Sequence, residues 1–188
     1  MDRLPRRRLR RDAAVSAPAA ALLPAADAAT VAAQVGRAPR DPWRVAVRCS
    51  HGFPSVIASP SVLADGTPFP TLYWLTCPFV AETASAEESA GGCSAWASRL
   101  AATPSLAETM RAADAALRDL RATESGGTDS CGSVGIAGQR DPLATKCIHA
   151  HAALALAGLA DPIGTELLER TGRECTDARC ANLTEDIG

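Results

Sequence analysis

The chain has 188 residues, a formal net charge of −2 and a sequence pI near 5.9. This length suits one domain with a hydrophobic core and terminal tails, and it leaves little room for a second complete domain. Proteins that bind nucleic acids or anionic membranes usually carry a basic excess, which this chain lacks. We therefore expect its partner to be a small molecule or another protein. We expect no membrane span, because no uninterrupted apolar run reaches the roughly 20 residues that a span requires.

The cysteines predict reduced thiols rather than a disulfide framework. The chain has seven, and an odd number in a chain this long argues against the paired cysteines of a small secreted domain. The first residues hold an arginine cluster followed by alanine and proline, and the prolines interrupt the apolar stretch that an export signal needs. We therefore expect a cytoplasmic protein in which residues 1–40 form a disordered tail.

Three short strands are expected after this tail. Residues 43–47 place an apolar side chain at every second position, which is typical of a half-buried strand. Residues 55–63 and 71–75 are further strand candidates, and Asp65–Gly66 between them is a favoured tight-turn pair. Together these segments predict a small antiparallel sheet.

The remaining chain is expected to be mainly helical. A helix should begin just after Cys77, and the apolar residues of 106–120 repeat at the spacing of a core-packing helix. Its charged residues, Asp114 among them, are expected to lie on the opposite, exposed face. A helix that is apolar on nearly every side is predicted over residues 141–157, and Asp-Pro at residue 161 begins a last helix.

These elements predict an α+β fold, in which a small antiparallel sheet packs on about four helices. The expected organisation is a single domain over residues 41–172 with a C-terminal tail at 173–188. The apolar helix of 141–157 should lie at its centre, because a helix without a polar face is a buried one. Cys175 and Cys180 fall in the polar tail and are interpreted as incidental.

A thiol and imidazole site is predicted in the segment Lys146-Cys147-Ile148-His149-Ala150-His151. Thiolate and imidazole are ligands that zinc prefers, and four of them in a tetrahedron close a structural site. In a helix from Asp141, Cys147 and His151 share a face, whereas His149 points to nearly the opposite side. We therefore expect two cysteines of the sheet to complete a zinc site. The predicted ligands are Cys49, Cys77, Cys147 and His151.

Other interpretations of these residues stay open. The chain has no C-x-x-C pair, so the spacing is not that of a zinc finger, and the cysteines could be small buried hydrophobes beside core histidines. Alternatively, Cys147 could be a nucleophile activated by a histidine. His51 could replace one ligand. A separate polar edge could bind an anion, and its candidate residues are Arg140, Lys146 and His149.

The segments quoted above resemble a bacterial, mostly actinobacterial, family known as domain of unknown function 501. The resemblance covers roughly Trp43 to Leu168. It rests on Arg48-Cys49, the run from Gly66 to Pro78 that contains Tyr73-Trp74-Leu75-Thr76-Cys77-Pro78, Gly135-Ile136, the run from Lys146 to His151, and Asp161-Pro162-Ile163-Gly164. The resemblance would place Asn at the position of Asp161, and both residues cap helices equally well.

The resemblance implies almost nothing about activity. In actinobacteria, genes of this family often lie near those for a septum-formation initiator and an exopolyphosphatase. Our leading functional hypothesis is a cytosolic protein with a Cys/His site that binds zinc. The alternatives are a non-catalytic interaction protein linked to cell division or envelope processes, and a thiol-dependent enzyme that uses Cys and His.

Overall fold

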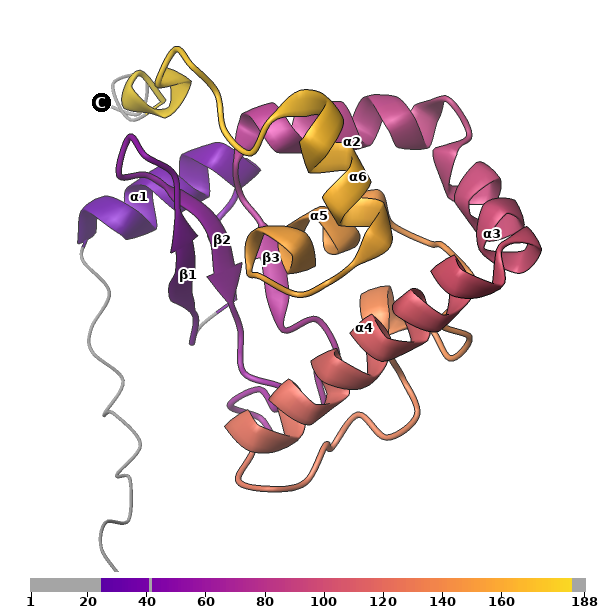
Figure 1. Cartoon of the computed structure of the whole chain (residues 1–188). Helices are drawn as coiled ribbons and strands as arrows, with labels where there is room; N and C mark the ends of the chain where they lie inside the picture. The colour runs from indigo at the N-terminus through magenta and orange to yellow at the C-terminus, as the bar shows by residue number, and fades with distance from the viewer. Residues whose placement is uncertain (1–24, 41, 184–188) are drawn as a thin grey trace, which may run out of the picture.

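The structure is a computed structural model that describes residues 25–40 and 42–183. It confirms the α+β prediction, with a three-stranded antiparallel sheet and six α-helices in the described residues (Figure 1). In chain order these are α1 (Ala25–Val35), β1 (Arg44–Arg48), β2 (Pro54–Ala58), β3 (Tyr73–Leu75), α2 (Pro78–Ser89), α3 (Gly92–Ala102), α4 (Pro104–Glu124), the 3-10 turn η1 (Ile136–Gly138), α5 (Ile148–Leu156), α6 (Pro162–Thr171) and the 3-10 turn η2 (Arg179–Ala181). Within the described ranges, no helix has the length and hydropathy needed to cross a membrane.

The sheet has the strand order β1-β2-β3, and both of its faces are covered. Every residue of β2 is buried, because α1 contacts one face of the sheet and α5 the other (Figure 1). Ile57 pairs with Trp74 and packs toward α1, whereas Val56 pairs with Leu75 and packs in the main core with α5. This alternation is the period of two that a strand imposes on its side chains.

Helix α1 corrects part of the expected disordered segment at residues 1–40. Val31 is 0% exposed and packs with Trp43 and Ile57, and the Asp27 carboxylate accepts hydrogen bonds of 2.8 and 2.6 Å from Arg48. Buried Val31 and the polar contacts of Asp27 and Gln34 hold an otherwise alanine-rich helix, so its sequence shows little amphipathic period. Residues 1–24 lie outside the described residues.

Helix α5 lies at the centre, as expected, but it begins at Ile148 rather than at Asp141. Asp141 forms a turn instead, with its carboxylate accepting from the Leu143 amide at 2.9 Å and its carbonyl from the Ala144 amide at 3.1 Å. An Asp-Pro pair can begin either a turn or a helix, and here the turn is formed. Helix α6 packs closely on α5, since a Cβ at Gly164 would lie 2.1 Å from the His151 carbonyl oxygen.

The glycine-rich loop after α4 is fixed by a buried carboxylate on that helix. Asp114, expected at the surface, is 1% exposed, and its Oδ1 accepts from the Ile136 amide at 2.9 Å. A Cβ at Gly135 would lie 1.7 Å from the same oxygen. The loop therefore needs glycine at this position in order to reach the carboxylate.

Replacing Gly135 by alanine should lower the free energy of unfolding by about 1–3 kcal/mol, the usual cost of overpacking. The added methyl group must displace Asp114 and lengthen its bond to the Ile136 amide. Chemical denaturation measures the loss, and exposed Ser133 in the same loop supplies Ser133→Ala as a control, expected within about 0.5 kcal/mol of the parent. Equal stabilities of the two variants would contradict this account of the loop.

The expected C-terminal tail is described as far as residue 183, and it packs on the domain. It contains η2, and Cys175 and Cys180 are 6% and 4% exposed. The polar composition of this segment concealed these contacts, because short irregular segments show no periodicity from which burial can be predicted.

Candidate functional site

The start of α5 brings Cys147 to His149 rather than to His151. Cys147 precedes the helix in an extended conformation, with φ −151° and ψ 111°, so its side chain does not follow the helical rotation that was expected. One possible ligand atom from each of Cys147, His149 and Glu88 lies within 4.8 Å of the other two. In the described part of the chain, no other set of three such residues is this close.

Glu88 in the last turn of α2 acts as the acceptor for the beginning of α5. Its Oε1 accepts from the Ile148 amide at 2.5 Å and from the His149 amide at 3.4 Å. The first amides of a helix have no partner within the helix, and the positive end of its dipole favours a carboxylate. The same oxygen lies 3.0 Å from His149 Nδ1, so one carboxylate fixes both the helix and the imidazole.

The electrostatics favour the ionised forms of His149 and Glu88. The Cys147 thiol beside His149 contributes most to raising the imidazole pKa to about 9, and Glu88 adds to this against the opposing effect of burial. Burial also opposes ionisation of Glu88, but hydrogen bonds from His149 and the Ile148 amide lower its pKa overall. His149 Nε2 lies 3.0 Å from Ser85 Oγ, so both ring nitrogens have neighbours that orient the ring.

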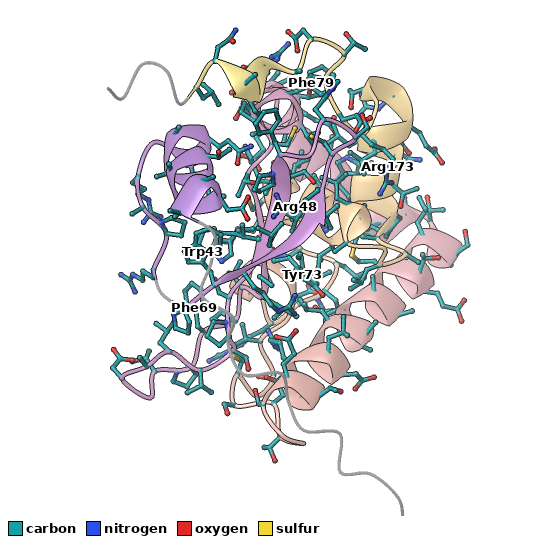
Figure 2. All side chains as sticks on the ribbon, turned by 90° about the vertical axis from the view of Figure 1, so that its left-hand side faces the viewer. Trp43, Arg48, Phe69, Tyr73, Phe79 and Arg173 are labelled. Atoms are coloured by element: carbon teal, nitrogen blue, oxygen red, sulfur yellow. The ribbon has the colours of Figure 1, made fainter. Side chains whose placement is uncertain are left out.

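Cys147 and His149 line a cleft of about 600 Å³ that runs along β3 to the segment after α1. The Phe69 and Trp74 rings in its wall stack with centroids 5.7 Å apart and an interplanar angle of 16°. Figure 2 shows Phe69 on the side of the sheet that carries α1. The indole nitrogen of Trp74 is buried with no partner among the described residues, which leaves a donor in the wall. Arg37 and Arg40 add positive charge to the lining.

The four predicted zinc ligands are not brought together. His151 is buried between α5 and α6, where its Nδ1 lies 2.6 Å from Asp161 Oδ2. Cys77 is the buried residue that precedes α2, and Cys49 is half-buried at the turn that follows β1. Of the predicted set, only Cys147 belongs to the group within 4.8 Å.

The predicted anion-binding edge is also divided. Arg140 and Lys146 are exposed, whereas His149 is half-buried and contacts the Glu88 carboxylate. A carboxylate against the imidazole opposes the approach of a second anion at that ring. Positive charge next to the cleft comes instead from Arg37 and Arg40, which sequence analysis had placed in the N-terminal tail.

Sequence analysis did not identify Glu88 as a site residue. It lies sixty residues before Ile148, in a helix whose sequence has two other acidic side chains. No spacing connects it to the cysteine and histidines, because the contact depends on how α2 packs on α5. The only local indication was that the first amides of α5 needed an acceptor, and that could be recognised only once the start of the helix was known.

The comparison with protein families gives a match over most of the chain. The model described as "Protein of unknown function (DUF501)" matches residues 45–169. The chain belongs to the DUF501 family. No curated protein and no solved structure matches it. The DUF501 range contains Glu88, Cys147 and His149 together with the aromatic wall of the cleft, and it ends before Cys175 and Cys180.

Proposed function

We propose that Glu88, Cys147 and His149 bind a divalent transition-metal ion, with zinc the best match, at one end of the cleft. The proposal rests on the ligand atoms of these residues, which lie within 4.8 Å of one another. They come from α2, from the first turn of α5 and from the residue just before α5, and the two helices pack on each other. Thiolate, imidazole and carboxylate are all zinc ligands, and three protein ligands leave a fourth position for water or substrate.

The cleft supports a small molecule as the partner of this site. Its stacked aromatic pair favours a flat, apolar group, and its two arginines favour an anionic one. Bound zinc supplies a Lewis acid and lowers the pKa of its water to about 7, which suits hydrolysis or polarisation of a carbonyl or phosphoryl group. Because the proposed ligands include a free thiol, we place the protein in the reducing cytoplasm.

Metal analysis of the full chain, purified without a histidine tag, tests the site. Cys147→Ser and His149→Ala should each remove one zinc ion per chain, because each loses one of three protein ligands. His151→Ala should keep this ion, since His151 faces Asp161. Cys131 has its thiol near the Ser61 carbonyl, so Cys131→Ser is a matched cysteine control that should also keep it. Unchanged zinc in Cys147→Ser and His149→Ala would refute the site.

A thiol-dependent reaction is the second candidate, and the same contacts favour it. Cys147 lies at the beginning of α5 next to His149, and Glu88 orients the imidazole. This is the arrangement of nucleophile, base and orienting carboxylate that activates thiol enzymes.

Alkylation by iodoacetamide, with the modified cysteine located by mass spectrometry, separates the zinc site from the thiol-dependent reaction. Bound zinc should protect Cys147 until a chelator is added, whereas an activated thiol reacts at once in metal-free native protein and more slowly in His149→Ala.

A further inference from the structure

The C-terminal segment contains two buried cysteines that take no part in the group of Glu88, Cys147 and His149. Cys175 and Cys180 are 6% and 4% exposed, although most of the residues around them are not buried. All seven cysteines of the chain are free thiols. A free cysteine is often buried simply as a small hydrophobe, so burial alone does not indicate a site. The contacts of the neighbouring residues are more informative.

The first part of this segment is attached to the turn that carries Cys49. The Glu174 carboxylate accepts from the amide and from the hydroxyl of Ser50, both at 2.6 Å. His51 Nε2 lies 2.9 Å from the Cys175 carbonyl oxygen. Residues adjacent to Cys49 therefore contact Cys175 and the residue before it.

The second part of the segment is attached to the beginning of α2, next to Cys77. The Arg179 guanidinium lies 5.4 Å from the centre of the Phe79 ring and pairs with Glu82 at 2.9 Å. Figure 2 shows Phe79 beneath the C-terminal segment. Gln34 of α1 donates to Cys180 Sγ at 3.3 Å, so the thiol of Cys180 is directed inward toward α1 and the sheet.

Hydrogen bonds also connect Cys180 to the stretch that carries Cys77. Gln34 Nε2, which lies 3.3 Å from Cys180 Sγ, donates to the Pro54 carbonyl at 2.8 Å. The same carbonyl accepts from the hydroxyl of Thr76, the residue before Cys77, at 3.2 Å. These contacts bring together the three stretches of chain that carry the four thiols, of which only Cys49 is not fully buried.

We propose that Cys49, Cys77, Cys175 and Cys180 form a second, structural metal site that holds one zinc ion through four thiolates. Four sulfur ligands with no open position are typical of structural zinc, which stabilises a fold rather than reacting. Binding forms four Zn–S bonds and releases four thiol protons to solvent, which leaves a net charge of −2 on the centre. Arg48 and Arg179 are each adjacent in sequence to a ligand and would offset part of this charge, although each is also paired with a carboxylate.

Closure of the site requires the four cysteine side chains to move toward one another. The four sulfurs are farther apart than the Glu88 group, and rotation of a cysteine χ1 to the next staggered position moves Sγ by about 3 Å. The ion would join the turn after β1, the start of α2 and the C-terminal segment. This site shares no ligand with the one proposed at Cys147, so an experiment can refute either proposal without refuting the other.

Zinc content of the reduced full chain tests this inference. Cys175→Ser and Cys180→Ser should each lose one zinc ion per chain, while Cys180→His should retain it because imidazole is also a zinc ligand. Cys131→Ser is the matched control that loses none, and Cys147→Ser loses only the other ion. X-ray absorption of Cys147→Ser should show sulfur ligands alone at about 2.3 Å.

Three results would overturn the inference. Cys175→Ser and Cys180→Ser could keep the zinc content of the parent chain. The ion retained by Cys147→Ser could show nitrogen or oxygen ligands. Mass spectrometry of protein prepared under reducing conditions could find a disulfide between two of the four cysteines, which would assign the cluster to covalent cross-linking instead.

Discussion

Replacing Arg121 by methionine should lower the free energy of unfolding by about 3–5 kcal/mol, the range found when one member of a buried ion pair is removed. Arg121 in α4 is 0% exposed. Its Nη2 pairs with Asp129 Oδ2 at 2.7 Å, and its Nη1 donates to the Pro70 carbonyl at 3.0 Å. Its Nη2 also donates to the Val134 carbonyl. One guanidinium thus joins α4, the glycine-rich loop and the approach to β3.

Methionine replaces most of the volume of arginine, so the expected loss comes from unpaired polar groups rather than from a cavity. The Asp129 carboxylate and two carbonyl oxygens would lose their donor. Exposed Arg111 on the same helix provides Arg111→Met as the matched control, expected within about 0.5 kcal/mol of the parent. Guanidinium unfolding followed by circular dichroism measures both. If Arg121→Met is no more destabilising than the control, the buried pair does not hold the loop.

The same helix shows how far the sequence could predict the core. Leucines and alanines at helical spacing placed Met110 and Leu117 on its buried face, and both are buried. The buried polar residues Asp114 and Arg121 could not be recognised, because charged side chains are usually exposed. Their burial depends on a loop that folds back over α4 and supplies an amide to one and acceptors to the other. Periodicity contains no information about such tertiary partners.

The segment predicted to hold the thiol and imidazole contains two residues that the structure brings together, but its helix begins later than expected. The Lys146–His151 segment does contribute two of the three residues in the group, and α5 is the buried central helix that its composition predicts. The angular argument that paired Cys147 with His151 required a helix from Asp141. Because α5 begins at Ile148, only the residues from that point follow helical rotation. The position of Glu88 could not be predicted without the packing of α2 on α5.

The capping residue of α6 was predicted correctly. The same side chain makes a second contact, and losing both contacts should strongly lower the free energy of unfolding. Asp161 Oδ1 accepts from the Gly164 amide at 2.8 Å, as expected for an N-cap. Its Oδ2 lies 2.6 Å from His151 Nδ1, and both side chains are almost fully buried. Asp161→Ala should therefore cost about 3 kcal/mol or more, since it removes the cap and leaves a buried imidazole unpaired.

Asp161→Asn separates the contribution of these contacts from that of the carboxylate charge. An asparagine oxygen can still accept from the Gly164 amide, while its NH2 group can donate to His151 Nδ1. We expect this variant to lose only about 1 kcal/mol, because each contact is replaced by a neutral hydrogen bond. Denaturant titration of the two variants beside the parent gives both values. If Asp161→Ala is as stable as Asp161→Asn, the bond to His151 contributes little, and packing of Gly164 against the His151 backbone is what holds α5 and α6 together.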